Sequence, residues 1–584
     1  MTPLVARSTP CNPRRADPRP PRCTEIVHLD GDAKRAIEIG RNRLLLAAAL
    51  FGLAFSAVAL RLVAIALLHD GAEPSLADAP PQTMQMERAN IVDRNGVILA
   101  TNLATASLYA NPRRVIDAEE AARRLAATLP DLDEKKLLAA LSSERSFVWI
   151  KRNLTPRQQY EVNRLGIPGL YFQHEEHRVY PQGSLTAHVI GFTDIDNHGL
   201  AGIELSFDDV LRGGREPLRL SIDVRIQHIL REELLRAISD FQGIGGTGVV
   251  LDARTGEILA MVSLPDFDPN APGAASADAR FNRATLGIYE MGSVFKLFNT
   301  ALALDRGTVE LSGGYDASKP IRIGGFTIRD FHGKNRWLSV PEILIYSSNI
   351  GSAKMADEVG TEAQRAFMAR LGMLEEAEVE LPELGRPLYP NPWRQINTMT
   401  ISYGHGIAVS PLHVVSAVAA MVNDGIMRPA TLLKREPHEV ATGDRVISAE
   451  TSAVMRELMR LVVTKGTASF ADVPGYLVGG KTGTAEKVGG RGYNKNSRLA
   501  SFVGAFPIND PRYVVLVMID EPKPNASSYG YATGGWVAAP AAGQVIQRMA
   551  LLLGIGPLDE PAVPDPQNDL LVAVRAADPA HAAE

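Results

Sequence analysis

The stretch YEMGSVFKLFNTALALDRG, residues 289–307, decides the fold of this 584-residue chain. It places Ser293 three residues before Lys296, so in a helix the two side chains lie on one face. Apolar residues surround both, which predicts a buried helix. Burial disfavours a charged amine, so a neutral Lys296 could take the proton of Ser293. Gly292 suits a helix start, where free N–H groups favour a developing anion.

Two more short motifs follow Ser293 along the chain. Residues 346–349 read YSSN, where Ser347 offers a hydroxyl that can relay a proton and Asn349 an amide that can hold a peptide. Residues 481–484 read KTGT and follow two glycines in a strand-like run, which permits close approach of a ligand backbone. A cation and two hydroxyls there could bind a terminal carboxylate. Each motif is common by chance; their joint presence is the signal.

The regions on either side of these motifs predict a sheet built from distant segments. Residues 217–264 read as a strand, an amphipathic helix and a hairpin, and residues 476–520 again read as strands. The stretch between them is mostly helical, which predicts a sheet flanked by helices. Residues from about 70 to 215 mix short strand-like and helical runs, with a hairpin turn DRNG at 93–96. The fold class that we predict is α+β.

A single apolar run near the N-terminus predicts a membrane anchor. Residues 44–68 are apolar except for Ser56 and Arg61, which is enough to cross a bilayer of roughly 30 Å as a helix. Nine Lys or Arg precede the run, and the other side has none until Arg88. The positive-inside rule therefore predicts a cytoplasmic N-terminus and an exported body. A compartment without ATP counts against a kinase or an ATPase.

Composition and isolated motifs exclude several other classes. The net charge of -5 gives no reason to expect nucleic acid binding. Both cysteines precede the anchor, so a thiolate zinc site or an internal disulfide beyond it is excluded, and we expect no cofactor and no metal. The glycine pattern at 243–248 follows a helix and precedes a strand, the reverse of a phosphate-binding loop. His174 and His177 are three apart rather than four, and His405 is interpreted as structural.

In this order the three motifs are the signature of penicillin-recognising serine enzymes. From about residue 40 to residue 550 the chain resembles the class B penicillin-binding proteins, and most closely the division-specific ones. Two positions depart mildly from the family, which usually has Pro where this chain has Met291 and Gly where it has Ala89. The supporting segments are Arg88 to Gly96, Arg178 to Pro181, Gly199 to Glu204, 220–223, 250–269 and 282–284.

The resemblance implies an anchored protein with a non-catalytic pedestal and a catalytic domain of the β-lactamase-like transpeptidase fold. The expected domains are a disordered cytoplasmic tail (1–43), an anchor (44–68), a pedestal of the dimerisation type (69–215), a transpeptidase domain (216–555) and a disordered C-terminal tail (556–584). It also implies a location in the cytoplasmic membrane, with the catalytic domain outside.

The resemblance further implies the activity and the role of each motif residue. Ser293 would attack the penultimate D-Ala carbonyl of a stem peptide, with Lys296 as general base, and a neighbouring amine would then take over the acyl group. Ser347 and Lys481 would pass the proton to the leaving group. Substrate binding would fall to Asn349 and to Thr482, Gly483 and Thr484, and the backbone N–H groups of Ser293 and Thr484 would hold the oxyanion. β-Lactams would imitate the donor and block Ser293.

The expected partners are stem peptides on nascent glycan strands, β-lactams, the membrane, a polytopic glycan polymerase of the SEDS type and other division proteins. Several rival functions stay open on the residues alone. The nearest is an elongation-specific transpeptidase. A carboxypeptidase is possible on chemistry, and so is a sensor or scaffold that binds β-lactam or wall peptide without turnover. A β-lactamase of class A would need a Glu–x–x–x–Asn between residues 350 and 480, which this chain lacks.

Overall fold

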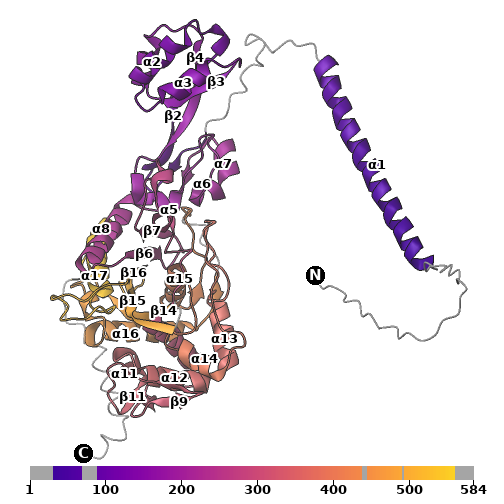
Figure 1. Ribbon diagram of the computed structural model, residues 1–584. Coiled ribbons are helices and arrows are strands. Elements are labelled where there is room, and N and C mark those ends of the chain that lie inside the picture. The colour runs from indigo at the N-terminus through magenta and orange to yellow at the C-terminus, as the bar shows by residue number, and fades with distance from the viewer. Residues whose placement is uncertain (1–30, 69–87, 437–442, 490–491, 559–584) are drawn as a thin grey trace, which may run out of the picture. The chain divides into compact units, whose positions relative to one another are not determined.

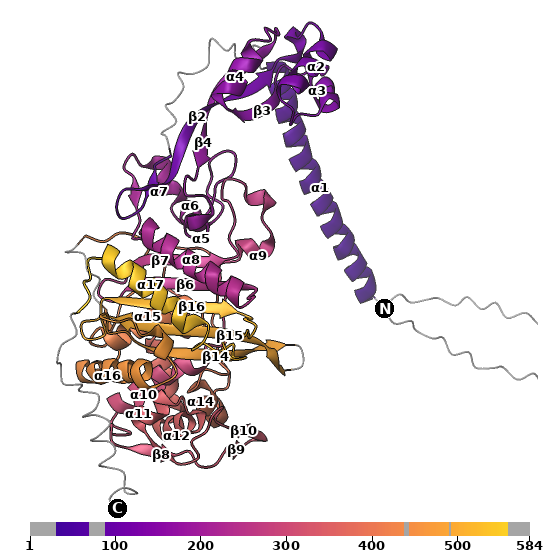
Figure 2. The same cartoon turned by 90° about the vertical axis from the view of Figure 1, so that its left-hand side faces the viewer.

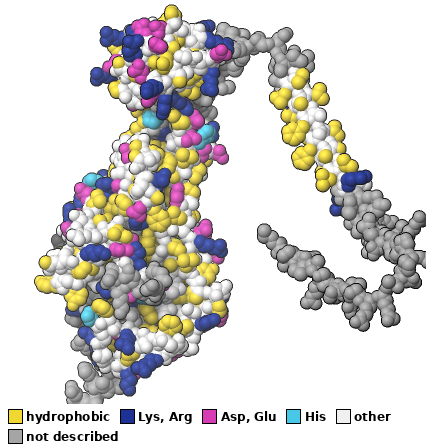
Figure 3. Space-filling view, viewed as in Figure 1, with side chains coloured by type: hydrophobic (Ala, Val, Ile, Leu, Met, Phe, Trp, Pro, Cys, Tyr) yellow, Lys and Arg dark blue, Asp and Glu magenta, His cyan; other side chains and the backbone are white. Residues whose placement is uncertain are grey.

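The computed structural model describes residues 31–68, 88–436, 443–489 and 492–558. They belong to two compact units, of which the first ends at Gln85. This first unit holds the helix α1 (Gly31–Leu68), shown in Figure 1, and its stretch Arg41–Val63 is long and apolar enough to span a membrane. Hydrophobic side chains cover the helix and Lys and Arg gather at one end (Figure 3).

The start of α1 corrects one prediction. The helix begins at Gly31, so disorder was wrongly predicted for residues 31–43. That segment, GDAKRAIEIGRNR, contains good helix formers and continues directly into the apolar run, so it adds turns without the cost of a new nucleus. The rest of the tail predicted to be disordered at the N-terminus, and the C-terminal tail from residue 559, lie outside the described residues.

The second unit starts with a five-stranded sheet, ordered β3-β2-β1-β5 with β4 paired to β2. The turn at 93–96 joins β1 and β2 as an antiparallel hairpin, as predicted. Asp117 and Asp133 cap two of the helices that pack beside it, accepting hydrogen bonds from first-turn N–H groups. The elements are β1 (Ile91–Val92), β2 (Ile98–Ala110), β3 (Val148–Leu154), β4 (Leu170–Val179), β5 (Leu218–Arg219), α2 (Ala118–Thr128), α3 (Glu134–Leu141), α4 (Pro156–Asn163), α5 (Ala187–Ile190), α6 (Gly202–Ser206) and α7 (Asp208–Gly213).

A buried ionic cluster joins three of the segments that carried the family resemblance. Glu204 accepts hydrogen bonds from Arg88 Nε and from Arg178 Nε, both at 2.7 Å, and its side chain is fully buried. Arg88 also pairs with Asp208 at 2.7 Å, and Arg178 donates to Asn102 Oδ1 at 3.0 Å. Glu204 is therefore paired with both arginines in the interior, and Arg178 Nη2 is the one buried nitrogen of the two arginines that lacks a hydrogen-bond partner among the described residues.

The catalytic half is built on an antiparallel sheet in the order β14-β15-β16-β6-β7. Two strands come from before residue 265 and three from after residue 478, so segments far apart in sequence share the sheet, as predicted. Residues along β6, β7 and β16 are all buried, because helices cover both faces. The strands are β6 (Gly245–Asp252), β7 (Ile258–Leu264), β14 (Gly479–Gly489), β15 (Gly492–Phe506) and β16 (Tyr513–Asp520).

Helices sandwich this sheet, which Figure 2 shows edge-on. α8 (Val224–Asp240) and α17 (Ala538–Leu552) lie on one face, while α15 (Pro411–Val422) and α16 (Ala449–Lys465) lie on the other. The terminal helix α17 was not predicted. It is rich in alanine and apolar nearly all along, and its burial against α8 and the sheet stabilises it.

Below this layer lies a helical region with small hairpins, which carries most of the site. Its first helix, α10 (Phe295–Asp305), is buried along its length, as predicted. Its other elements are β8 (Gly314–Asp316), β9 (Ile321–Ile323), β10 (Phe326–Ile328), β11 (Trp337–Ser339), α11 (Val340–Ile345), α12 (Asn349–Val359), α13 (Thr361–Arg370) and α14 (Gln395–Ile401). Elsewhere in the unit are α9 (Ala277–Arg280), near α5 and α8 in Figure 2, and the paired strands β12 (Ile426–Met427) and β13 (Asp444–Arg445).

Candidate active site

Ser293 and Lys296 meet at the start of α10. Sequence predicted a single helix, but the first turn, Gly292–Val294, is a tighter 3₁₀ turn that leads into the α-helix at Phe295. The two side chains still face one way, and Lys296 Nζ lies 2.8 Å from Ser293 Oγ, within hydrogen-bond distance. Lys296 is fully buried among apolar neighbours, whereas Ser293 stays partly accessible.

Two glycines let the backbone pack closely at this turn. Gly292 has φ +57°, and a Cβ there would lie 2.7 Å from the carbonyl oxygen of Thr484. Gly404 has φ +80°, and a Cβ there would lie 2.1 Å from the carbonyl oxygen of Gly292. No side chain fits at either place, since contacts under 3 Å are forbidden to carbon. The turn that carries Ser293 is therefore held between strand β14 and the loop at Gly404.

The YSSN segment forms the second wall of the site, in the turn between α11 and α12. Ser347 has φ +58°, a strained conformation for a residue other than glycine, which aims its hydroxyl and its carbonyl at Lys296. Lys296 Nζ lies 3.1 Å from Ser347 Oγ and 2.7 Å from Asn349 Oδ1. Ser348 turns the other way and caps α12 by accepting from Gly351 N.

The KTGT segment of β14 forms the third wall. Lys481 is fully buried and donates to Ser347 Oγ at 3.1 Å, so one serine hydroxyl lies between two amines. Thr482 Oγ1 bonds to Thr467 Oγ1 at 2.7 Å, and Thr484 Oγ1 accepts from Gly534 N at 3.0 Å. A Cβ on Gly483 would lie 2.5 Å from the carbonyl oxygen of Met291, so glycine lets the strand lie against the nucleophile turn.

Burial sets the protonation of both lysines. It lowers the pKa of Lys296 well below the ordinary value, and the positive charge of Lys481 lowers it further, while Asp330 opposes the shift. Burial also lowers the pKa of Lys481 to about 7. Of the four oxygen atoms within hydrogen-bond distance of Lys296 Nζ, two, Ser347 O and Asn349 Oδ1, can only accept. The two protons of a neutral amine can serve them, which leaves its lone pair for the hydroxyl of Ser293.

All eight residues singled out in the sequence lie at this one place, although they come from three distant segments. Sequence reasoning missed several supporting groups. Asp330 accepts from Ser348 Oγ at 2.7 Å and from Ile350 N at 2.9 Å, which fixes the start of α12. The carbonyl of Arg329 accepts from Asn349 Nδ2 at 3.0 Å. An isolated Asp in an irregular loop carries no signal of this role, and only the run SYGHG hinted at Gly404.

The motifs rejected in the sequence lie where that interpretation put them. The glycine-rich run at 243–248 leads from α8 into β6 and so opens no helix. His177 Nδ1 bonds to Asn153 in the pedestal sheet. His405 is partly buried beside Tyr403, with 5.3 Å between the ring centroids, and this burial lowers its pKa.

A partly accessible serine beside a buried lysine amine, with a second serine and a second lysine next to them, defines a serine acyl-transfer enzyme on a sheet flanked by helices. Two family models match the chain in agreement with this architecture. The penicillin-binding protein transpeptidase domain matches residues 246–547, and the penicillin-binding protein dimerisation domain matches residues 83–233.

Curated relatives that match most of this chain show which kind of penicillin-binding protein it resembles. The chain is 42% identical over 537 residues to a probable peptidoglycan D,D-transpeptidase FtsI of Caulobacter vibrioides, covering 90% of each chain. It is 30% identical to the peptidoglycan D,D-transpeptidase FtsI of Escherichia coli K12, covering 82% of this chain and 85% of that one. Penicillin-binding protein 3 of Mycobacterium tuberculosis, solved with aztreonam, superimposes with a TM-score of 0.64 at 26% identity and covers 82% of this chain and 98% of its own.

The chain therefore belongs to the class B penicillin-binding proteins, as a peptidoglycan D,D-transpeptidase of the FtsI or penicillin-binding protein 3 type. It acts on the peptides of peptidoglycan and binds β-lactams. This confirms the resemblance that the three motifs indicated. The apolar helix α1 is consistent with a single-pass membrane anchor.

Proposed function

We propose that Ser293 is the nucleophile and Lys296 its general base. Neutral Lys296 takes the hydroxyl proton as Ser293 Oγ attacks the carbonyl carbon of the penultimate D-Ala of a stem peptide. The observation that carries this assignment is the 2.8 Å contact between Lys296 Nζ and Ser293 Oγ in a fully buried setting, where the pKa of the amine is lowered well below its ordinary value.

Ser347 and Lys481 return that proton to the departing D-Ala. The Ser347 hydroxyl lies 3.1 Å from both Lys296 Nζ and Lys481 Nζ, so it can receive a proton from one side and pass one to the leaving amine. The C–N bond breaks as the leaving nitrogen is protonated, which leaves an ester on Ser293. An amine of a neighbouring stem peptide then attacks this ester, its proton goes to the serine oxygen, and the cross-link forms.

The remaining motif residues bind the donor peptide. Asn349 already turns its amide toward Lys296 and orients the donor beside the nucleophile. Thr482 and Thr484, with the charge of Lys481, hold the terminal carboxylate, and Gly483 gives the donor backbone room along β14. The N–H groups of Ser293 and Thr484 bind the oxyanion, because the two segments touch at Gly292. Each such donor contributes roughly 3 kcal/mol in other acyl-transfer enzymes.

We also infer how the whole chain is organised. Residues 44–68 would be the anchor, 69–215 the pedestal and 216–555 the transpeptidase domain. The nine Lys and Arg before residue 44 favour a cytoplasmic N-terminus and an extracytoplasmic catalytic domain. Cys11 and Cys23 are the chain's two cysteines, and both precede the anchor. In this orientation a membrane-impermeant maleimide should label the protein when it is added on the cytoplasmic side and should not label it when it is added on the other side.

The cellular process that we propose is septal wall synthesis during cell division. The support is the likeness to proteins named FtsI over most of the chain, and the rival remains an elongation-specific transpeptidase. The partners would then be nascent glycan strands, a polytopic glycan polymerase of the SEDS type and other division proteins. Depletion of the protein should leave filaments with unfinished septa; round cells would instead favour the elongation role.

The nucleophile can be tested by covalent labelling of the full chain in detergent. We expect a fluorescent penicillin to form one adduct, which peptide mass mapping locates on the peptide with Ser293. Ser293→Ala should lose the adduct completely, while Ser142→Ala, an exposed serine of the pedestal, should label as the wild type does. If Ser293→Ala still formed the penicillin adduct, on the same peptide as in the wild type, the assignment of Ser293 would be overturned.

A further inference from the structure

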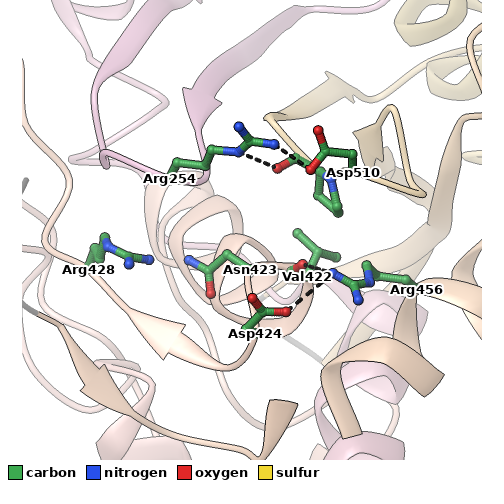
Figure 4. A pocket seen from close by; sticks show the side chains of 8 residues that line it. Arg254, Val422, Asn423, Asp424, Arg428, Arg456 and Asp510 are labelled. Atoms are coloured by element: carbon green, nitrogen blue, oxygen red, sulfur yellow. Dashed lines mark hydrogen bonds and ion pairs between the residues drawn. The ribbon is translucent and has the colours of Figure 1, made fainter. Parts of the chain in front are cut away.

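A second polar pocket lies on the catalytic unit, at the end of the sheet where four loops and helices meet. Its volume is about 470 Å³. Arg254 comes from the turn between β6 and β7, Asp510 from the turn between β15 and β16, Asn423 and Arg428 from the segment after α15, and Arg456 from α16 (Figure 4). None of these residues belongs to the active site described above.

The three arginines of this pocket differ in how they are paired. Arg254 forms an ion pair with Asp510, and Arg456 forms one with Asp424 at 3.4 Å. Arg428 has no ion pair with any described residue, and its buried Nε lacks a hydrogen-bond partner among them. Its guanidinium nevertheless extends toward Asn423, into the pocket (Figure 4).

The acceptors of the lining are already engaged. Asp510 and Asp424 pair with Arg254 and Arg456, and the amide oxygen of Asn423 accepts from Ile426 N at 2.9 Å. Burial lowers the pKa of Arg428, which Asp252 and Asp424 only partly offset. The side chain of Arg428 is only partly buried, but its Nε is buried without a partner among the described residues, so an anion that enters the pocket would supply the missing acceptor.

The lining also limits the kind of anion. Three arginines and two aspartates leave a surplus of one positive charge, which suits a monoanionic carboxylate better than a doubly charged phosphate beside Asp424 and Asp510. A guanidinium fork matches a carboxylate with two parallel hydrogen bonds. The volume is in the range of sites that hold small ligands. We propose that this pocket binds a carboxylate of an acidic peptide segment, with Arg428 as the principal ligand.

One source of such a segment is the chain itself. Residues 559–584 contain six acidic residues against one arginine. The last described residue, Leu558, donates its N–H to Gly475 O, and Arg460 donates to Val478 O three residues further on. Arg456 of the pocket is one helical turn from Arg460, so Leu558 lies within roughly 30 Å of the pocket. The 26 residues of this segment are long enough to cover that distance.

The other source is a wall stem peptide, whose free carboxylates have the same chemistry; this source rests on the proposed function. The two sources are separated with two fluorescein-labelled probes, a synthetic peptide of residues 559–584 and a stem pentapeptide ending in D-Ala-D-Ala. Binding is followed by fluorescence anisotropy on the full chain in detergent and on a variant that stops after Leu558. Both proteins are first acylated with penicillin, so the probes cannot occupy the active site.

The discriminating variants are Arg428→Ala, Arg428→Lys and, as the control, Arg365→Ala, an exposed arginine on α13. We expect at least one probe to saturate, with affinity reduced tenfold or more in Arg428→Ala, partly retained in Arg428→Lys and unchanged within twofold in Arg365→Ala. Binding of the tail peptide at least fivefold tighter to the shortened chain than to the full chain identifies the chain's own segment as the occupant. Saturation by the stem pentapeptide alone identifies the wall peptide.

Two results would overturn the proposal: neither probe saturates, or Arg428→Ala and Arg365→Ala weaken binding equally. Thermal unfolding of each variant checks that a loss of binding does not come from a loss of fold. Failure of penicillin to acylate the protein would count against Ser293 as the nucleophile and not against the pocket, because the tail peptide can still be titrated onto the unacylated chain.

Discussion

At the scale of single residues, the site is governed by two buried amines with different tasks. In the proposed mechanism Lys296 has to be neutral to accept a proton, whereas Lys481 has to carry charge to hold a carboxylate. Burial lowers the pKa of both, and Lys481 at about 7 is charged only in neutral and acidic solution. The positive charge of Lys481 in turn helps to keep Lys296 neutral. The two groups therefore titrate as a coupled pair.

This pairing predicts a bell-shaped pH dependence for acylation by penicillin. On the acid side the rate should rise with pH as Lys296 loses its proton, and on the alkaline side it should fall with an apparent pKa near 7 as Lys481 loses its own. Stopped-flow measurement of the second-order acylation rate from pH 4 to pH 10 checks this expectation.

Lys481→Arg is the matched variant for the alkaline limb, because arginine keeps its charge over the whole range. In this variant the fall above neutral pH should disappear, at a reduced maximal rate. A wild-type rate that climbs steadily to pH 10 would contradict the assigned roles of both lysines.

At the scale of elements, the start of α12 carries the second wall of the site. Its first turn is fixed by Ser348 as cap and by Asp330, which accepts hydrogen bonds from both the Ser348 hydroxyl and Ile350 N. Asp330 thus fixes the backbone beside Ser347 and Asn349 through its contacts with Ser348 and Ile350. It is a positioning residue, and its negative charge also raises the pKa of Lys296.

We expect Asp330→Ala to reduce the acylation rate about tenfold and to cost about 1–3 kcal/mol of stability, since two donors lose their acceptor. Removing the charge should also move the acid limb of the pH profile to lower pH. The control is Asp316→Ala. Asp316 lies in an exposed turn, where it accepts a hydrogen bond from Ser318 N, so this change should leave the acylation rate and its pH profile unaltered. An unaltered pH profile in Asp330→Ala, with only stability lost, would reduce Asp330 to a structural cap.

At the scale of the whole molecule, the buried cluster of Arg88, Arg178 and Glu204 ties the pedestal segments together. Taking one partner out of a buried ion pair leaves an uncompensated charge, which typically costs 3–5 kcal/mol. Glu204→Gln should therefore lower the thermal midpoint by several degrees, while the acylation rate at 25 °C stays within twofold, because none of the eight site residues contacts the cluster.

The control for this variant is Glu120→Gln, which breaks the exposed pair with Arg124 on α2. An exposed pair of this kind contributes under about 1 kcal/mol, so its midpoint should hardly change. Differential scanning calorimetry measures the thermal midpoints of both variants. Equal midpoints would mean that the buried cluster adds no net stability. A loss of acylation in Glu204→Gln alone would instead indicate that the pedestal controls the catalytic unit.

The sequence by itself determined the local elements and the chemistry that they carry. The turn at 93–96, the hairpin of β6 and β7 and the buried helix after Ser293 follow from short-range patterns of apolar residues, glycines and turn formers. Ser293 and Lys296 could be paired because a helix places neighbours three apart on one face. The order of the three motifs then indicated the family.

Only the tertiary structure decided how distant segments meet. Ser347 lies 51 residues from Lys296 and 134 from Lys481, yet its hydroxyl bonds to both amines. Asp330 and the pocket at Arg428 left no usable signal in the sequence, and only the run SYGHG hinted at Gly404, because each depends on which surfaces of the sheet and helices come into contact. The helix α17 was not predicted, although its segment is rich in alanine. The periodicity of apolar residues determines which element a segment forms. Which elements then contact one another is determined by the close packing of the whole unit, and this packing brings the three motifs together in one site.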